Sequence, residues 1–317
     1  MSFDNITDVP GVKVGHVEDP KALTGCSVII TEEGAVCGVD VRGAAPGTRE
    51  TDLLDPVNMV NKVHGICLSG GSAFGLDASS GVMRYLEEQG IGLDVSVAKV
   101  PIVPSAILFD LAVGDASVRP DADMGVCSCE KAARGIFKQG NVGAGCGATV
   151  GKIMGFEQCM KGGLGSAAIT LDNGLTVGAM VAVNSLGEVR DPKTGECLAS
   201  AIHPETGELV DSEEFMLSQV ESFGRVGQNT TIGAIAVNAK LTKSEATKVS
   251  QIAHNAIGRT IYPAHTMFDG DTIFTLANGD RQFSLDVIGS LATQVLEKAI
   301  IRAIKEAESI NGIKAYE

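Results

Sequence analysis

A short segment near the C-terminal third places an amide and two hydroxyl side chains directly before an apolar run. Asn229, Thr230 and Thr231 stand where a polar loop meets a stretch typical of a buried strand. If the Asn229–Thr230 bond is broken, Thr230 begins a new chain with a hydroxyl and a free α-amine on one residue. An α-amine has an ordinary pKa of about 7.7–8.0, so it can act as base for that hydroxyl. The pattern predicts an N-terminal threonine nucleophile that requires no histidine.

The same hydroxyl could release its own N-terminus, because attack on the Asn229 carbonyl through an N-to-O acyl shift would cut the chain there. A simpler explanation also exists. Paired threonines at the start of a strand are favoured by β-propensity alone. Asp269, Gly270 and Asp271 could supply carboxylates to the nucleophile, but a solvated Asp-Gly-Asp turn is the simpler explanation of those residues.

Other chemical signals are incomplete. Residues 143–147 are rich in glycine like a dinucleotide-binding loop, but they follow an expected helix over residues 130–137 rather than a strand. His265, Asp269 and Asp271 could ligate a metal, but three hard ligands within seven residues are weak evidence. We therefore expect neither a metal ion nor an organic cofactor.

Composition and charge exclude several classes of protein. Lys and Arg number 25 and Asp and Glu 39, a net charge of −14 that offers no footprint for nucleic acid or an anionic membrane surface. There is no run of 18 apolar residues and no signal-peptide pattern at the N-terminus, so we expect no membrane association. The eight cysteines show no paired spacing, and reduced thiols in a cytoplasmic protein are expected.

Hydrophobic periodicity and turn residues predict a mixture of strands and helices in an α+β outline. Glu33 and Gly34 indicate a hairpin turn, and the Asn173-Gly174 pair indicates a second one. Thr242 and Glu245 form a capping box that begins a helix. The expected strands are 27–31, 35–41, 63–68, 167–171, 175–183, 231–237 and 271–276; the expected helices are 73–88, 242–257 and 285–307; and residues 187–228 are expected to form an exposed polar connection.

Six motifs in order along the chain carry a resemblance to a known family. They are Pro-Gly-Val-Lys-Val-Gly-His at 10–16, Val-Arg-Gly at 41–43, Ser-Gly-Gly-Ser-Ala-Phe-Gly-Leu at 69–76, Gly-Ala-Gly at 143–145, Asn-Thr-Thr-Ile at 229–232 and His-Thr-Met-Phe-Asp-Gly-Asp-Thr at 265–272. Their order resembles the L-aminopeptidase/D-esterase-amidase family of self-cleaving N-terminal-nucleophile-type hydrolases. Within that family the chain looks most like the nylon-oligomer (6-aminohexanoate oligomer) endo-hydrolases.

The resemblance implies a four-layer αββα sandwich of the self-cleaving aminopeptidase/ornithine-acetyltransferase type. A single hydrolase domain over residues 1–317 would be cut into a large chain, 1–229, and a small chain, 230–317, which stay associated. The resemblance also implies a homo-oligomer, a tetramer of cleaved protomers.

The implied activity is hydrolysis of small oligoamides or peptides through an acyl-enzyme on Thr230. Three alternatives stay open at this point. The first is an aminopeptidase for short peptides or for β- or D-amino-acid peptides. The second is an ornithine-acetyltransferase-like acyltransferase, which passes the acyl group to an amine instead of water. The third is an unprocessed binding protein on the same scaffold, without turnover.

The resemblance assigns roles to three further polar residues. Asp269 and Asp271 match the family's acidic pair; if they alternate along a strand, both would face the Thr230 ammonium or hydroxyl. Asn184 matches an asparagine whose side-chain amide could donate to the oxyanion. A turn-forming role for Asn184 is about as well supported by the residues alone.

Lys152 matches a lysine near the nucleophile, and its ammonium could lower the pKa of the Thr230 amine and stabilise negative charge. An ordinary surface lysine is the alternative, and Lys161 is a rival for the role. Phe109 stands where the family often carries a tyrosine close to the active site. A phenyl ring cannot donate a hydrogen bond, so either Asn184 carries the oxyanion together with a backbone amide, or substrate choice differs here. Phe109 is expected in the substrate pocket.

Overall fold

A computed structural model of the chain describes residues 2–219 and 229–317. Its strands are β1 (Lys13–Asp19), β2 (Thr24–Val41), β3 (Thr48–Arg49), β4 (Lys62–Ser69), β5 (Leu93–Asp94), β6 (Lys99–Val100), β7 (Ser105–Ile107), β8 (Thr149–Val150), β9 (Met160–Lys161), β10 (Gly163–Thr170), β11 (Thr176–Asn184), β12 (Glu188–Arg190), β13 (Cys197–Ala199), β14 (Thr230–Val237), β15 (Ile261–Tyr262) and β16 (Thr272–Ala277). Its α-helices are α1 (Ala78–Glu88), α2 (Ala122–Glu130), α3 (Ser212–Ser218), α4 (Lys243–Thr260) and α5 (Leu285–Lys305).

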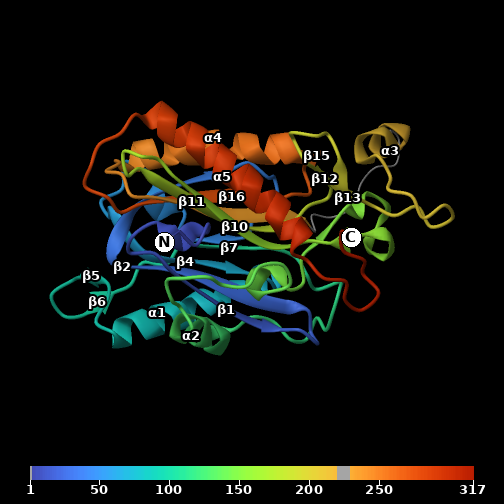
Figure 1. Ribbon diagram of the computed structural model, residues 1–317. Coiled ribbons are helices and arrows are strands. Elements are labelled where there is room, and N and C mark those ends of the chain that lie inside the picture. Colours follow the sequence, from blue (N-terminus) through green and yellow to red (C-terminus); the bar gives the residue numbers. More distant parts are fainter. Residues whose placement is uncertain (1, 220–228) are drawn as a thin grey trace.

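One large sheet contains most of the long strands, in the order β10-β11-β14-β16-β2-β4-β7-β3, with β1 also paired to β2. Strand β2 joins its two halves. The first part of β2 pairs with β1 and β4, and its last six residues pair with β16. Helices α4 and α5 cover one outer face, and α1 and α2 cover the opposite face (Figure 1).

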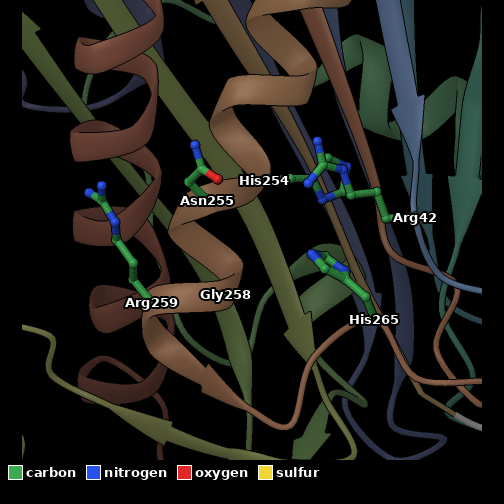
Figure 2. Close-up of a pocket in the computed structure, with 6 residues that line it drawn as sticks. All are labelled: Arg42, His254, Asn255, Gly258, Arg259 and His265. Carbon is green, nitrogen blue, oxygen red and sulfur yellow. The ribbon is translucent and has the colours of Figure 1, made fainter.

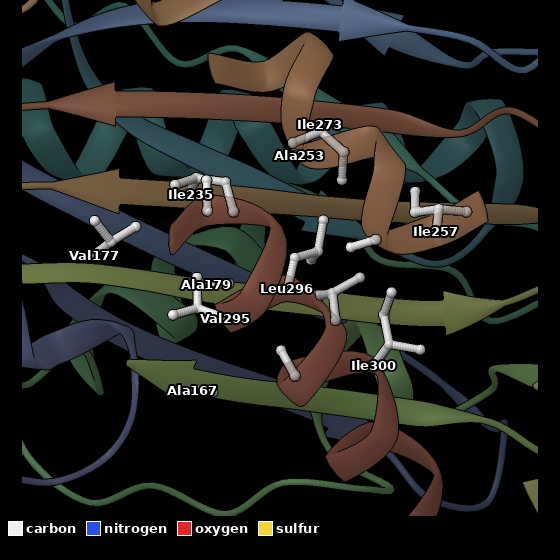
Figure 3. Packing of buried hydrophobic residues seen from close by; sticks show 14 of the residues in the cluster. Ala167, Val177, Ala179, Ile235, Ala253, Ile257, Ile273, Val295, Leu296 and Ile300 are labelled. Atoms are coloured by element: carbon white, nitrogen blue, oxygen red, sulfur yellow. The ribbon is translucent and has the colours of Figure 1, made fainter. Parts of the chain in front are cut away.

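Three apolar clusters separate these layers. The first lies between α4, α5 and the half-sheet β10-β11-β14-β16, and Figure 3 shows Ile273 beside Ala253 of α4 within it. The second lies between the two half-sheets and includes side chains from β2, β4, β14 and β16. The third packs β2 and β4 against α1 and α2. The predicted α+β class and four-layer αββα sandwich are therefore confirmed.

Local sequence signals account for several elements that position the candidate active site. Gly174 adopts a φ of +86°, which a glycine accepts readily, and closes the predicted hairpin between β10 and β11. The Thr242 hydroxyl accepts from the Glu245 backbone N–H, while the Glu245 carboxylate accepts from Thr242, so the predicted capping box begins α4. No helix in residues 2–219 and 229–317 is long and apolar enough to cross a membrane.

The expected hairpin at Glu33 and Gly34 is wrong. Strand β2 continues through both residues, and only its register with β4 shifts between Ile30 and Ala35. Gly34 has a φ of +73°, so the residue that predicted a turn forms a bulge inside one long strand.

The expected helix over residues 130–137 is also wrong. Helix α2 begins after Asp121, whose carboxylate accepts from the Met124 backbone N–H, and it ends at Glu130. The chain then pairs with β1, because the backbone groups of Val14 and Ala133 bond each other in both directions.

The polar connection is more ordered and more buried than expected over residues 187–219. It contains β12, β13 and α3, and the Glu188 carboxylate is buried, accepting from the Ser212 backbone N–H at 2.7 Å. The part of this prediction that falls on residues 220–228 lies outside the described residues.

Candidate active site

Thr230 is the first residue of β14 and is only 4% exposed. Strand β14 lies between β11 and β16, with Thr230 opposite Asn184 in the antiparallel register with β11. The Thr230 hydroxyl donates to the carbonyl of Asn229, the residue before it. The same carbonyl accepts the backbone N–H of Gly270 at 3.0 Å. The bond expected to be cut is thus buried, polarised by an N–H group and next to a hydroxyl.

The segment before β16 approaches this bond through its backbone. Asn229 bridges in parallel to Asp269, and the Asn229 N–H donates to the Phe268 carbonyl at 3.3 Å. A Cβ at Gly270 would lie 2.7 Å from the Ala45 carbonyl oxygen and 2.9 Å from the Thr230 Oγ1 atom, closer than real Cβ atoms come to other atoms. Glycine is therefore required where this backbone passes the hydroxyl.

The two carboxylates lie just before β16, not on a strand as expected, and each is 2% exposed. Asp271 accepts the Thr231 backbone N–H at 2.7 Å. Asp269 accepts from the backbone N–H of Thr266 at 2.8 Å and from its hydroxyl at 2.6 Å. Among the described residues of the uncut chain, neither carboxylate accepts a hydrogen bond from Thr230.

Burial raises the pKa of Asp269 to about 6, and the neighbouring Asp271 charge acts in the same direction. The hydrogen bonds from Thr266 and the charge of Lys152 oppose that rise only in part. Asp269 therefore changes charge close to neutral pH, as catalytic carboxylates often do.

Asn184 ends β11 beside Thr230 and is fully buried. Its Oδ1 atom accepts from the Thr149 backbone N–H and from the Lys152 ammonium, both at 2.9 Å. Its Nδ2 group donates one hydrogen to the Phe109 carbonyl at 3.0 Å. A side-chain amide carries two such hydrogens, so the oriented Nδ2 group has a second donor to offer.

Lys152 opens a short 3₁₀ helix, Lys152–Met154, and its ammonium also donates to the carbonyls of Thr149 and Asn184. Burial lowers its pKa to about 7. The rival Lys161 is placed differently, because its ammonium donates to three backbone carbonyls, those of Gly145, Ala148 and Gly162, at 2.8–2.9 Å. Lys152 is thus the lysine joined to Asn184.

Phe109 is half-buried, and its ring centroid lies 6.2 Å from that of Phe156. Its backbone carbonyl orients Asn184, a contact that any residue type could make. A phenyl ring at residue 109, where the resemblance leads us to expect a tyrosine, therefore leaves this backbone contact unchanged.

Sequence reasoning missed two contributors to the site: the Gly270 backbone N–H and Thr266. Both lie inside the motif at 265–272, so their position was marked while their roles were not. His265 was considered as a metal ligand, but its Nδ1 atom lies 2.8 Å from the Asp271 carboxylate. No group of three or more His, Cys, Asp or Glu side chains in the described ranges could hold a metal ion.

The sequence profile of peptidase family S58 matches residues 4–317. The chain belongs to peptidase family S58. Over 99% of its length it is 40% identical to an uncharacterized aminopeptidase of Mycobacterium leprae, covering 93% of that protein. Over 94% of its length it is 30% identical to a 6-aminohexanoate-oligomer endohydrolase of Kocuria sp., covering 85% of that protein.

Solved structures agree on the fold of this S58 chain. The L-aminopeptidase D-Ala-esterase/amidase of Ochrobactrum anthropi, described as a variant of the Ntn hydrolase fold, superposes with a TM-score of 0.74 at 17% identity, covering 99% of this chain and 91% of that one. A Burkholderia sp. β-aminopeptidase gives 0.69 at 20% identity, covering 99% and 90%. The resemblance found in the motifs is confirmed, and the chain is a hydrolase of amide or peptide bonds.

Proposed function

We propose that the chain cuts itself between Asn229 and Thr230, and that Thr230 is then the nucleophile of an amide hydrolase. The observation that carries the proposal is the geometry of the Asn229 carbonyl. The Thr230 hydroxyl lies against it, and the Gly270 N–H donates to it at 3.0 Å. A nucleophile and an oxyanion donor thus meet at one buried peptide bond.

In self-cleavage, the Thr230 Oγ1 atom attacks the Asn229 carbonyl carbon and the C–N bond breaks. The hydroxyl proton passes to the peptide nitrogen, which leaves as the α-amine of Thr230. The Gly270 N–H stabilises the negative charge that develops on the carbonyl oxygen. The product is an ester between Asn229 and the Thr230 hydroxyl, which water hydrolyses. This step frees the N-terminus of the small chain, 230–317.

In substrate hydrolysis, the free α-amine accepts the hydroxyl proton while Thr230 attacks the substrate amide. The amine part of the substrate leaves, and an acyl ester forms on Thr230. Asn184 is oriented to donate its remaining Nδ2 hydrogen to the oxyanion, with Lys152 adding positive charge through its contact with Asn184. Asp269 and Asp271 supply negative charge next to the new ammonium group. Water then releases the acid and restores the hydroxyl.

The substrate class that fits best is a small oligoamide or short peptide with an apolar stretch. Ile153, Leu186 and Phe268 belong to one apolar cluster, and each is close in sequence to a polar site residue. An aliphatic chain could pack there while its amide faces Thr230. The names of the relatives support this class, because they include 6-aminohexanoate-oligomer endohydrolases and aminopeptidases. We propose 6-aminohexanoate oligomers and short peptides as the substrates to test.

A pair of isosteric variants tests the nucleophile. Thr230→Val keeps the shape of the side chain but removes its hydroxyl, so it should abolish both self-cleavage and turnover. Thr231→Val is the matched control, because the Thr231 hydroxyl has no partner among the described residues. Thr230→Ser should keep both activities. Self-cleavage that continued in Thr230→Val, or that stopped equally in Thr231→Val, would count against Thr230.

Two further parts of the proposal come from the resemblance and the cysteines. Cleaved protomers are proposed to assemble as a homotetramer, which the native mass of the protein would test. A cytoplasmic location is proposed because the eight cysteines are free thiols, as a reducing compartment requires.

A further inference from the structure

A pocket of about 370 Å³ lies beside α4 and is lined in part by His265. Figure 2 shows it beside α4, with His254 and His265 close to Arg42. Asn255, Gly258 and Arg259 complete its lining. One member of this lining, His265, also belongs to the segment that carries Asp269 and Asp271. The pocket therefore reaches the candidate active site through that residue.

His265 binds one oxygen of Asp271 twice. Its ring Nδ1 atom lies 2.8 Å from Asp271 Oδ2, and its backbone N–H donates to the same oxygen at 3.2 Å. An ionised carboxylate only accepts hydrogen bonds, so the Nδ1 atom carries the proton in this contact. The other carboxylate oxygen, Oδ1, accepts the Thr231 N–H at 2.7 Å. Asp271 thus links His265 to the residue that follows the nucleophile.

The groups beside His265 on the α4 side have hydrogen-bond or ion-pair partners other than Asp271. His254, whose ring centroid lies 5.0 Å from that of His265, is buried, and burial lowers its pKa to about 4, so it is neutral at pH 7. The His254 Nε2–H donates to the Asp40 carbonyl at 3.0 Å. The Asp40 carboxylate, in turn, is held by Arg42 at 2.7 Å. The two arginines of the pocket are paired with other carboxylates, Arg42 with Asp40 and Arg259 with Glu297.

The backbone conformation at His265 allows its double contact with Asp271. Its φ is +57°, a left-handed conformation that non-glycine residues adopt rarely and that Asn and Asp tolerate best. This conformation brings the backbone N–H and the ring to the same carboxylate oxygen. Thr266, the next residue, donates to Asp269 in the same way. One short segment thus holds both carboxylates.

We propose that His265 is a positioning residue of this hydrolase, which fixes Asp271 and, through the Thr231 N–H, the start of β14 that carries Thr230. The inference rests on the proposed function of Thr230. It assigns His265 no contact with substrate. A misplacement of a reacting group by about 1 Å can cost about 100-fold in rate. Loss of the contact between the His265 ring and Asp271 should therefore cause a measurable fall in rate.

Two variants that both tolerate the left-handed backbone separate the hydrogen bond from the conformation. His265→Asn places an amide N–H where the imidazole Nδ1–H lies, whereas His265→Gly removes the donor. We expect kcat and the self-cleavage rate of the Gly variant to fall about tenfold or more, with KM changed by less than about threefold. The Asn variant should recover both rates to within about threefold of the unchanged protein.

Controls keep the result interpretable. Arg259→Gln alters the same pocket without touching Asp271, so its kcat should match that of the unchanged protein. Folding of each variant is checked by its urea midpoint. If the Gly variant does not fold, His265→Ala takes its place, because alanine offers Asp271 neither a side-chain donor nor a charge.

Two results would overturn the inference. One is a Gly variant, or its Ala substitute, that cleaves and turns over as fast as the unchanged protein. The other is an Asn variant as impaired as the variant without a donor. Thr230→Val, measured alongside, separates the two proposals. If Thr230→Val stays active, the proposed function fails; if it is inactive while the His265 variants behave normally, only the role of His265 fails.

Discussion

Replacing Asp269 by asparagine should stabilise the fold while it removes activity. The carboxylate is 2% exposed and lies near the charge of Asp271, and these surroundings raise its pKa from the ordinary 3.8 to about 6. At about 1.36 kcal/mol for each pKa unit, keeping this group ionised costs the folded state about 3 kcal/mol. Asparagine carries no charge, and its Oδ1 atom can still accept both hydrogen bonds from Thr266.

The direction in which stability changes with pH follows from proton binding by Asp269. Because the folded-state pKa is raised, the folded chain binds more protons than the unfolded chain between pH 3.8 and about 6. The contribution of Asp269 to stability is therefore fully present below pH 3.8 and is lost as the pH rises through about 6. Asp269→Asn does not undergo this loss. The free energy of unfolding of Asp269→Asn should exceed that of the protein with Asp269 most at pH 8, and the two should be equal near pH 4.

Urea unfolding measures this difference. Both proteins carry Thr230→Val, so that each is a single uncut chain, and the free energy of unfolding is obtained by linear extrapolation at pH 4, 6 and 8. We expect Asp269→Asn to be more stable by about 1–3 kcal/mol at pH 8, with an unchanged dependence on urea. Equal or lower stability at pH 8, or a difference independent of pH, would refute the account of Asp269.

Three further changes have expected outcomes. Gly270→Ala would place a Cβ 2.9 Å from the Thr230 Oγ1 atom, so self-cleavage followed on denaturing gels should slow about tenfold or more. Lys152→Met removes the ammonium that orients Asn184, so kcat should fall about tenfold or more, and a pH–rate profile should lose any step near the lysine pKa of about 7. Ile235→Ala should lower the free energy of unfolding by about 2–5 kcal/mol in urea, because this side chain is fully buried beneath α5.

Elements with strong local signals could be predicted from the sequence. The Asn173-Gly174 turn specified the β10–β11 hairpin, and the capping box at Thr242 specified the start of α4. The bulge in β2 could not be predicted in this way. Glu33 and Gly34 have the residue types of a hairpin turn, and only the partners on both sides keep the strand continuous.

The candidate site also contains residues that could be predicted from the sequence and contacts that could not. Thr230 was predicted from its motif, and Asn184 and Lys152 from the family resemblance. The structure brings Asn184 into register with Thr230 and bonds Lys152 to Asn184. The Gly270 N–H contact could not be foreseen, because it depends on β14 and β16 running parallel beside each other. Residue types reveal side-chain chemistry, whereas a backbone donor is placed by non-local pairing.

The most direct test of the central claim is the intact mass of the purified protein under denaturing conditions. The account predicts two species of about 24 kDa and about 9 kDa, which divide the 32.7 kDa chain at the Asn229–Thr230 bond, with Thr230 at the new N-terminus. A single species of 32.7 kDa in an actively hydrolysing preparation would contradict it, because the nucleophile would then lack the free α-amine on which the mechanism depends.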